Sequence, residues 1–154
     1  MKDLKIKDVS VKAKQGQYGI VFTSWNPSIV QDLLKETKKE LVSQGVDEAN
    51  IYLKEVPGAF ELPLATQFMA EKEGILSVIS LGAIIRGDTP HFDFISSSCL
   101  EGLQKVSLKT RIPVICGVLT TNTIEQAEER SNPNKMNKGK EFALTALNMV
   151  DSLS

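Results

Sequence analysis

Short apolar runs alternate with segments of helical periodicity along this chain. The runs are rich in Val, Ile, Leu and Phe and predict four β-strands, over 18–22, 51–56, 75–85 and 113–119. The segments between and after them carry apolar residues at helical spacing and predict helices over 27–44, 60–73, 92–109, 124–130 and 138–151. Because strands that alternate with helices form parallel sheets covered on both faces, the pattern predicts a three-layer α/β domain with a four-stranded parallel sheet and flavodoxin-like order.

Capping residues mark the boundaries of two of these helices. Asn26 precedes Pro27, which predicts an N-cap followed by proline at the first helical position, and Gly45 ends the same helix. Thr123 and Gln126 have the spacing of a capping box and predict the start of the helix that follows the fourth strand.

The N-terminal segment has a weaker pattern. Apolar residues alternate with polar ones between Leu4 and Val11, which is typical either of an arm or of an edge strand. Such a strand would extend the chain's own sheet or the sheet of a neighbouring subunit. We therefore divide the chain into an arm, residues 1–14, and a single domain, residues 15–154.

The composition narrows the classes of function. A net charge of −1 gives no electrostatic support for binding nucleic acid or an anionic membrane, and no stretch has the apolar length of a membrane span. Cys99 and Cys116 both lie in apolar surroundings, which predicts buried thiols in a reducing, cytoplasmic compartment. Neither forms a metal-ligand spacing with the single histidine, so we expect no metal site.

The loop after the third predicted strand holds the most distinctive chemistry. Residues 87–93 include the only histidine of the chain, His91, and a threonine, Thr89. Backbone amides and a hydroxyl can bind an anion, and histidine exchanges protons near neutral pH. The loop therefore predicts proton transfer on a small phosphorylated substrate. The alternative is a turn in which the histidine caps the next helix.

Other candidates follow the remaining strands, where ligands bind in open α/β sheets. Trp25 predicts a stacking platform for a heterocycle, or a core side chain. Glu61 predicts an acceptor for ligand hydroxyls or ring N–H groups, or a carboxylate that stabilises a helix N-terminus. Arg130 predicts a phosphate clamp, or a cation that stabilises a helix C-terminus. Together the candidates at these strand ends predict a crevice that binds a planar ring with polyol groups beside a phosphate.

Long motifs of the chain closely resemble the lumazine synthase family. The matching segments are 56–63, 82–94, 117–130 and 137–139, and the similarity extends in order over about residues 15–150. The family condenses 5-amino-6-ribitylaminouracil with 3,4-dihydroxy-2-butanone 4-phosphate to 6,7-dimethyl-8-ribityllumazine in riboflavin biosynthesis. The reaction releases phosphate and water and uses no metal or organic cofactor. The resemblance implies the same reaction here.

The resemblance also implies roles for single residues. Trp25 would stack on the pyrimidine ring with Asn26 beside it, and His91 would be the main proton shuttle. The residues implied around the ring and the ribityl chain are Ala59, Phe60, Glu61 and Ile84. The residues implied at the phosphate are Asp88, Thr89, Arg130 and Lys138.

The family's pocket lies between neighbouring subunits of a homopentamer. This arrangement would account for Cys116, Arg130 and Lys138, which belong to parts of the chain that need not meet His91 within one subunit. The loop 132–139 keeps the family's usual length, so Lys138 still aligns. It carries Asn134 where lysine is frequent, near contacts that decide between a free pentamer and an icosahedral shell of sixty subunits. Both assemblies stay open.

Two further positions depart from the family pattern. The tripeptide Ser24-Trp25-Asn26 stands where the family commonly has Arg-Phe-Asn. The ring of tryptophan is larger than that of phenylalanine, which predicts appreciable riboflavin binding. Cys116 replaces a bulky apolar residue, often phenylalanine, which predicts a roomier pocket and weaker substrate binding.

Two other functions compete with the synthase. An archaeal-type riboflavin synthase has a related fold but binds no phosphate, so the loop around Thr89 and the match at Arg130 argue against it. A non-catalytic flavin or lumazine carrier, or a shell protein, would bind flavin without releasing phosphate. The enzyme is favoured over the carrier by the retained residues His91, Glu61, Arg130 and Lys138.

Overall fold

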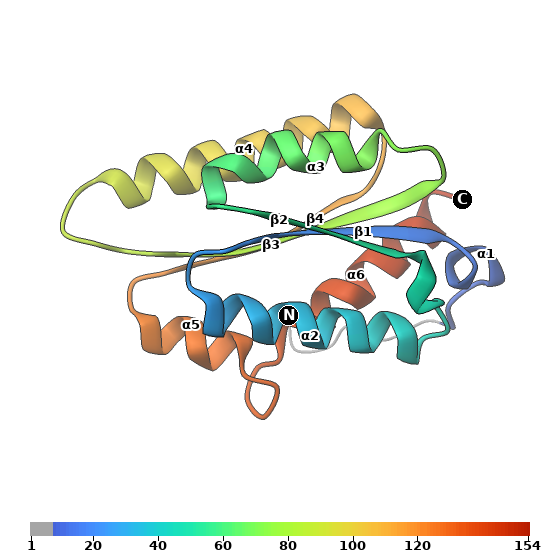
Figure 1. Cartoon of the computed structure of the whole chain (residues 1–154), viewed down its shortest axis with the longest axis horizontal. Helices are drawn as coiled ribbons and strands as arrows, with labels where there is room; N and C mark the ends of the chain where they lie inside the picture. Colours follow the sequence, from blue (N-terminus) through green and yellow to red (C-terminus); the bar gives the residue numbers. More distant parts are fainter. Residues whose placement is uncertain (1–7) are drawn as a thin grey trace.

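A computed structural model describes residues 8–154, which form a four-stranded parallel sheet with helices on both faces (Figure 1). The strands are β1 (Gln17–Thr23), β2 (Ile51–Val56), β3 (Ile75–Ile85) and β4 (Val114–Thr121). Their order across the sheet is β2-β1-β3-β4, and every neighbouring pair is parallel. The predicted three-layer, flavodoxin-like α/β fold is confirmed.

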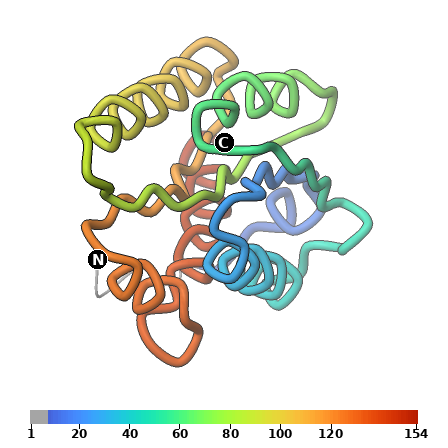
Figure 2. Tube along the Cα trace, turned by 60° about the vertical axis from the view of Figure 1, so that its left-hand side comes forward, coloured from blue at the N-terminus to red at the C-terminus, as the bar shows by residue number. Residues whose placement is uncertain are grey.

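The helices form two layers (Figures 1 and 2). One face of the sheet is covered by α3 (Leu62–Ala70) and α4 (His91–Thr110), which lie side by side. The other face is covered by α2 (Pro27–Ser43), α5 (Ile124–Ser131) and α6 (Lys138–Ser152), with the short α1 (Val11–Lys14) beside α6. Two short 3-10 turns, η1 (Glu48–Asn50) and η2 (Ala59–Glu61), flank β2.

The predicted elements agree closely with these bounds. The strand expected over 113–119 runs on to Thr121. The helix expected over 60–73 is shorter, because η2 precedes it and the α-helical part ends at Ala70. Thr123 and Gln126 form the predicted capping box, in which the Thr123 hydroxyl accepts a hydrogen bond from the Gln126 amide.

The sheet separates two apolar clusters. On β3, Ile79 and Leu81 contribute to the cluster under α2 and α6, whereas Val78 and Ile84 contribute to the cluster under α3 and α4. A central parallel strand is buried on both faces, which explains the nearly continuous apolar sequence of β3. Within residues 8–154, no helix is long and apolar enough to cross a lipid bilayer.

Of the two alternatives for the N-terminal pattern, an edge strand does not continue into the described residues, and the arm stays a prediction. Val11 begins α1 rather than continuing a strand, because the Ser10 hydroxyl accepts a hydrogen bond from the Ala13 amide and caps a helical turn. Ala13 is fully buried, and its carbonyl accepts a 2.8 Å hydrogen bond from the Tyr18 hydroxyl. Leu4, at the start of the alternating pattern, lies outside the described residues.

The prediction of two buried thiols is half right. Cys99, on α4, is buried, whereas Cys116, on β4, is exposed. The reason is the strand order: β4 forms an edge of the sheet, so its flanks are less covered than those of the central strands.

Candidate active site

Trp25 packs against the backbone of Gly58 at the carboxyl ends of β1 and β2. Its side chain is 66% exposed, so the predicted platform is accessible rather than part of the core. A Cβ atom at Gly58 would lie 2.5 Å from two carbons of the indole ring. Only glycine therefore lets the ring lie this close to the turn that follows β2.

Hydrogen bonds extend the pairing of β1 and β2 beyond the sheet. The amide of Ser24 donates to the carbonyl of Val56 at 2.8 Å, and the amide of Trp25 donates to that of Pro57 at 3.2 Å. The Ser24 hydroxyl donates to Glu55 Oε1 at 2.9 Å. The turn that carries the indole is thus fixed to the end of β2 by both backbone and side chain.

Asn26 connects the same turn to β3. It occupies the predicted N-cap position of α2, but it has left-handed backbone geometry (φ 56°) and its side chain caps nothing. Its Nδ2 instead donates to the carbonyl of Ala83 at 3.1 Å, next to the buried Ile84. The predicted position is confirmed, and the predicted capping role of the side chain is wrong.

The turn η2 places the next three candidates. Ala59 is buried, whereas Phe60 is 66% exposed. Glu61 ends η2 and precedes α3, so it lies just ahead of the first turn of the helix in which it was expected. Its Oε2 accepts a 3.1 Å hydrogen bond from the amide of Gly58. The carboxylate therefore also stabilises the turn on which the indole lies.

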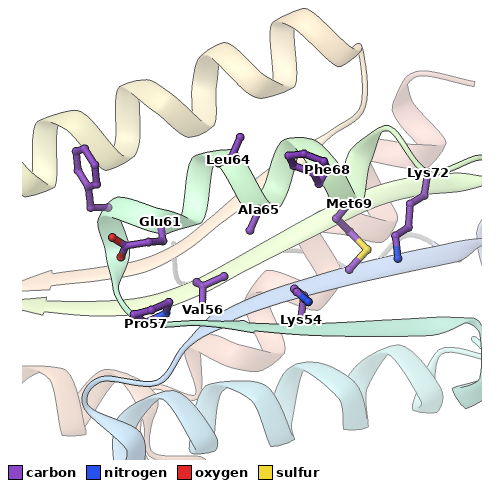
Figure 3. A pocket seen from close by; sticks show the side chains of 10 residues that line it. Lys54, Val56, Pro57, Glu61, Leu64, Ala65, Phe68, Met69 and Lys72 are labelled. Atoms are coloured by element: carbon purple, nitrogen blue, oxygen red, sulfur yellow. The ribbon is translucent and has the colours of Figure 1, made fainter.

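A groove of about 610 Å³ lies beside this turn, between β2 and α3 (Figure 3). Pro57 and Glu61 line one end, and Lys54 and Lys72 line the other. Its lining residues do not include Trp25, so the groove adjoins the crevice at the strand ends and shares only η2 and its neighbours with it.

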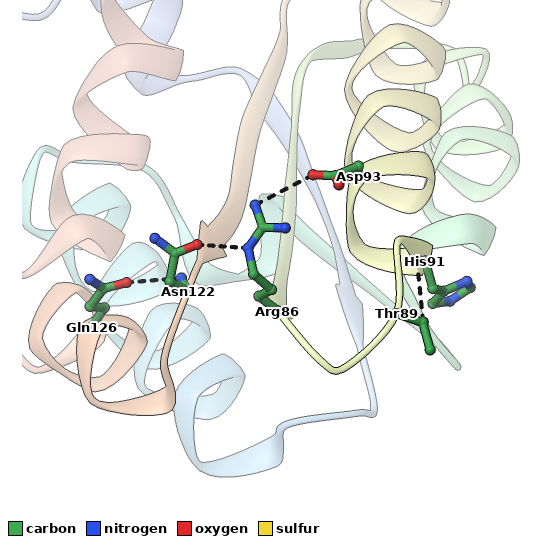
Figure 4. Close-up of polar contacts among 6 residues, drawn as sticks. All are labelled: Arg86, Thr89, His91, Asp93, Asn122 and Gln126. Carbon is green, nitrogen blue, oxygen red and sulfur yellow. Dashed lines mark hydrogen bonds and ion pairs between the residues drawn. The ribbon is translucent and has the colours of Figure 1, made fainter.

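The loop after β3 is open to solvent. Asp88, Thr89 and His91 are all exposed, and His91 is the first residue of α4 (Figure 4). Its backbone amide donates to Thr89 Oγ1 at 3.4 Å. No side chain caps α4, so the alternative in which the His91 imidazole caps this helix is wrong.

Arg130, Lys138 and Cys116 lie elsewhere in the chain. Arg130 Nη1 donates to the carbonyl of Gln126 at 3.0 Å, and Lys138 Nζ lies 2.7 Å from Glu141 Oε2. Cys116 pairs with Ser80, four residues before the level of Ile84 on β3 and therefore about 13 Å along the strand. Over residues 8–154, no hydrogen bond or ion pair joins any of these three side chains to the His91 loop.

The start of α6 is fixed against α2, and this determines where Lys138 begins the helix. Asn137 has φ 45°, and its Nδ2 donates to Glu36 Oε2 at 3.5 Å. The Thr37 hydroxyl donates to the carbonyl of Gly139 at 3.0 Å. A Cβ at Gly139 would lie 2.7 Å from a backbone oxygen of α2, so a residue without a side chain allows this approach.

The cysteines are not activated nucleophiles. Burial, and to a smaller extent the nearby Cys116, raises the pKa of the Cys99 thiol to about 12. Partial desolvation raises the pKa of the Cys116 thiol as well. Reactive thiols have lowered pKa values, so neither cysteine is suited to covalent catalysis. Among residues 8–154, no group of three or more His, Cys, Asp and Glu side chains is placed to hold a metal ion.

Sequence reasoning did not assign three groups that shape this site. They are Gly58 under the indole, the Ser24 hydroxyl on β2, and the side chain of Arg86 at the end of β3. The Pro57–Gly58 pair does signal a turn, but contact between that turn and Trp25 depends on the pairing of two strands that are distant in sequence.

An exposed indole, an acidic turn and a loop with threonine and histidine therefore follow the carboxyl ends of β1, β2 and β3, at one edge of the sheet. The model of the 6,7-dimethyl-8-ribityllumazine synthase family matches residues 15–154, which span β1 to α6 and all the candidate site residues. The similarity indicated by the motifs is confirmed. The chain belongs to the 6,7-dimethyl-8-ribityllumazine synthase family, enzymes of the transferase class that form lumazine in riboflavin biosynthesis.

Proposed function

We propose that the protein condenses 5-amino-6-ribitylaminouracil with 3,4-dihydroxy-2-butanone 4-phosphate to 6,7-dimethyl-8-ribityllumazine, releasing phosphate and water. The observation that carries this proposal is the position of Trp25. Its accessible indole lies on Gly58 at the carboxyl ends of β1 and β2, and Asn26 ties the same turn to β3, which leads into the His91 loop. A planar ring stacked there has proton-transfer and anion-binding groups on the adjoining loop.

The ring and the ribityl chain would be held by the turns after β1 and β2. Trp25 stacks on the pyrimidine, a contact that fixes the plane of the ring. Glu61 accepts hydrogen bonds from ligand N–H or hydroxyl groups, because a carboxylate has two oxygens and the Gly58 amide uses one of them. The remaining contacts in this proposal come from Asn26, Ala59, Phe60 and Ile84.

The phosphate would bind where Asp88 and Thr89 offer backbone amides and a hydroxyl, with Arg130 as a bidentate clamp and Lys138 assisting. His91 moves protons during imine formation, phosphate elimination, tautomerisation and ring closure. A well-placed acid–base group of this kind accelerates a reaction by about 10²- to 10⁴-fold. Holding the two substrates together supplies much of the remaining acceleration.

The pocket would be completed by a neighbouring subunit, since in residues 8–154 no hydrogen bond or ion pair joins Cys116, Arg130 or Lys138 to the His91 loop. We propose a homopentamer, with an icosahedral shell as its higher assembly. Large apolar side chains on α3 and α4 support a subunit interface, because Leu64, Phe68 and Phe94 are each about two-thirds exposed or more. Light scattering should give five times the chain mass of 16.9 kDa or a multiple of that pentamer.

The accessible indole also favours riboflavin as a ligand, since a flavin offers a larger ring to stack on Trp25. Titration with the protein should quench flavin fluorescence. Unquenched fluorescence at saturating protein would exclude this second proposal without affecting the first.

The decisive experiment follows lumazine absorbance and phosphate release together after the two substrates are mixed with the purified protein. Both should rise in step, faster than the uncatalysed background. His91→Ala should slow turnover without abolishing it, because binding and orientation remain. Lys39→Met, which changes an exposed side chain on the outer side of α2, serves as the control and should match the wild type. Ligand binding with no product above background would instead indicate a carrier.

A further inference from the structure

Arg86 connects two segments on either side of the open loop (Figure 4). Its backbone amide donates to the carbonyl of Thr121 at 2.9 Å, which extends the pairing of β3 with β4. Its side chain contacts both the turn after β4 and the first turn of α4. Nε donates to Asn122 Oδ1 at 2.9 Å, in the turn after β4, and Nη2 lies 3.4 Å from Asp93 Oδ1, in the first turn of α4.

The guanidinium also stacks on an aromatic ring. Its central carbon lies 4.3 Å from the centroid of the Phe92 ring, the residue directly after His91. A planar guanidinium can donate from its edge and stack with its face at the same time, whereas the ammonium of lysine cannot. The three contacts thus depend on an arginine at this position.

The loop itself has little else to fix it. No atom lies within 4 Å of the Cβ position of Gly87, and the hydrogen bond between the His91 amide and Thr89 is long. We propose that Arg86 is a positioning residue. Its side chain holds the first turn of α4 against the turn after β4, and thereby sets where Thr89 and His91 present their polar groups. This inference rests on the proposed function of the site.

The geometry of Arg86 supports a role in positioning the loop rather than in contacting the substrate. In Figure 4 the Arg86 side chain extends between Asn122 and Asp93, while the His91 ring points away from it. The backbone amide of Asn122 in turn donates to Gln126 Oε1 at 2.9 Å, so the turn that Arg86 holds is itself fixed to α5. Exposed ion pairs are individually weak, and only the combination of donors and stacking makes this a defined position.

The test compares Arg86→Met and Arg86→Lys with Lys39→Met, which also removes one exposed cation. Arg86→Met should lower kcat/KM by about 10- to 100-fold, the scale of a misplacement of about 1 Å. Arg86→Lys should not restore the activity. Asp93→Ala, which removes the acceptor, should cause part of the loss, and combining it with Arg86→Met should add nothing further, because both changes break one connection.

A direct contact with phosphate predicts other results. In that case Arg86→Met would raise the inhibition constant of inorganic phosphate and the KM of the butanone phosphate while leaving kcat unchanged. Arg86→Lys would then rescue activity, and Asp93→Ala would act independently. Any of these results would overturn the inference.

Amide hydrogen exchange keeps the test separate from the proposed reaction. In Arg86→Met, the amides of residues 88–94 should exchange faster than in the wild type, with unchanged exchange in β1 and in Lys39→Met. Equal exchange in all three proteins would overturn the positioning role, even if the wild type proves to be an active synthase. Faster exchange in a protein that makes no lumazine would reject the proposed function alone.

Discussion

The turn that carries Trp25 and the loop that carries His91 follow neighbouring strands, but they are held in different ways. Backbone and side-chain hydrogen bonds fix the Trp25 turn to β2 and β3, and its indole lies against Gly58. The His91 loop is exposed and is held from its two ends. The part of the site proposed to bind the ring is therefore built before any ligand arrives, whereas the part proposed to bind phosphate depends on its flanking residues.

Gly58→Ala should disturb the fixed turn that carries Trp25, and we expect it to have the largest effect of the four substitutions below. The new Cβ would lie 2.5 Å from indole carbons, and the exposed ring must move because the glycine backbone is fixed. Losing a stacking platform costs roughly 1–3 kcal/mol, so the Kd of the uracil substrate should rise by about 5- to 150-fold. Emission from Trp25, the only tryptophan of the chain, should shift as well. Unchanged affinity and emission would show that the ring does not depend on this contact.

Asn26→Asp should have the second-largest effect. Aspartate tolerates the left-handed backbone at this position, but its carboxylate cannot donate to the carbonyl of Ala83 and repels it instead. We expect a loss of about 1–2 kcal/mol, measured as roughly a tenfold fall in kcat/KM. Wild-type kinetics in this variant would mean that the bond to β3 does not fix the turn.

Ser24→Ala should have a smaller effect. It removes the hydrogen bond to Glu55 but leaves the backbone bond from the Ser24 amide to Val56. Because the pair is exposed, the loss should be about 0.5 kcal/mol, or roughly twofold in the Kd of the uracil substrate. Glu55→Gln keeps an acceptor and serves as the matched control, with a still smaller change. A tenfold loss in Ser24→Ala would assign the hydroxyl a role in ligand binding itself.

Gly87→Ala should have the smallest effect of all, and it is the counterpart of the same substitution at Gly58. No atom lies within 4 Å of the new Cβ, and Gly87 does not have a positive φ. The kcat/KM should stay within about twofold, and thermal stability should rise slightly because alanine restricts the unfolded chain. A large loss would show that the loop packs closely against substrate or a second subunit in the working enzyme.

The elements of the fold could be predicted because their signals are local. Apolar runs located the strands, including β3 over 75–85, and the capping box of Thr123 and Gln126 located the start of α5. The exposure of Cys116 could not be predicted in the same way. Whether an apolar strand lies at the centre or at an edge follows from the strand order, which its own composition does not specify.

The candidate site could be predicted less completely than the fold. The sequence left two alternatives for Trp25, an accessible platform or a core side chain, and the structure favours the first. The hydrogen bond of the Asn26 side-chain amide could not be predicted, because its acceptor is the carbonyl of Ala83, far along the chain, rather than a group of its own helix. The contact of Arg86 with Asn122 likewise joins segments that meet only when β3 and β4 pair. Its contact with Asp93, in the first turn of the helix that follows β3, is local. Contacts between distant segments depend on register, which local patterns leave open.

The contact between Trp25 and Gly58 also constrains how the sequence can diverge. A substitution at Gly58 introduces a Cβ that strikes the indole, so it would be disfavoured for as long as tryptophan occupies position 25. Replacement of Trp25 by a smaller residue removes that conflict and opens position 58 to change. The two sites are therefore expected to evolve as a pair in a preferred order, with position 25 changing before position 58.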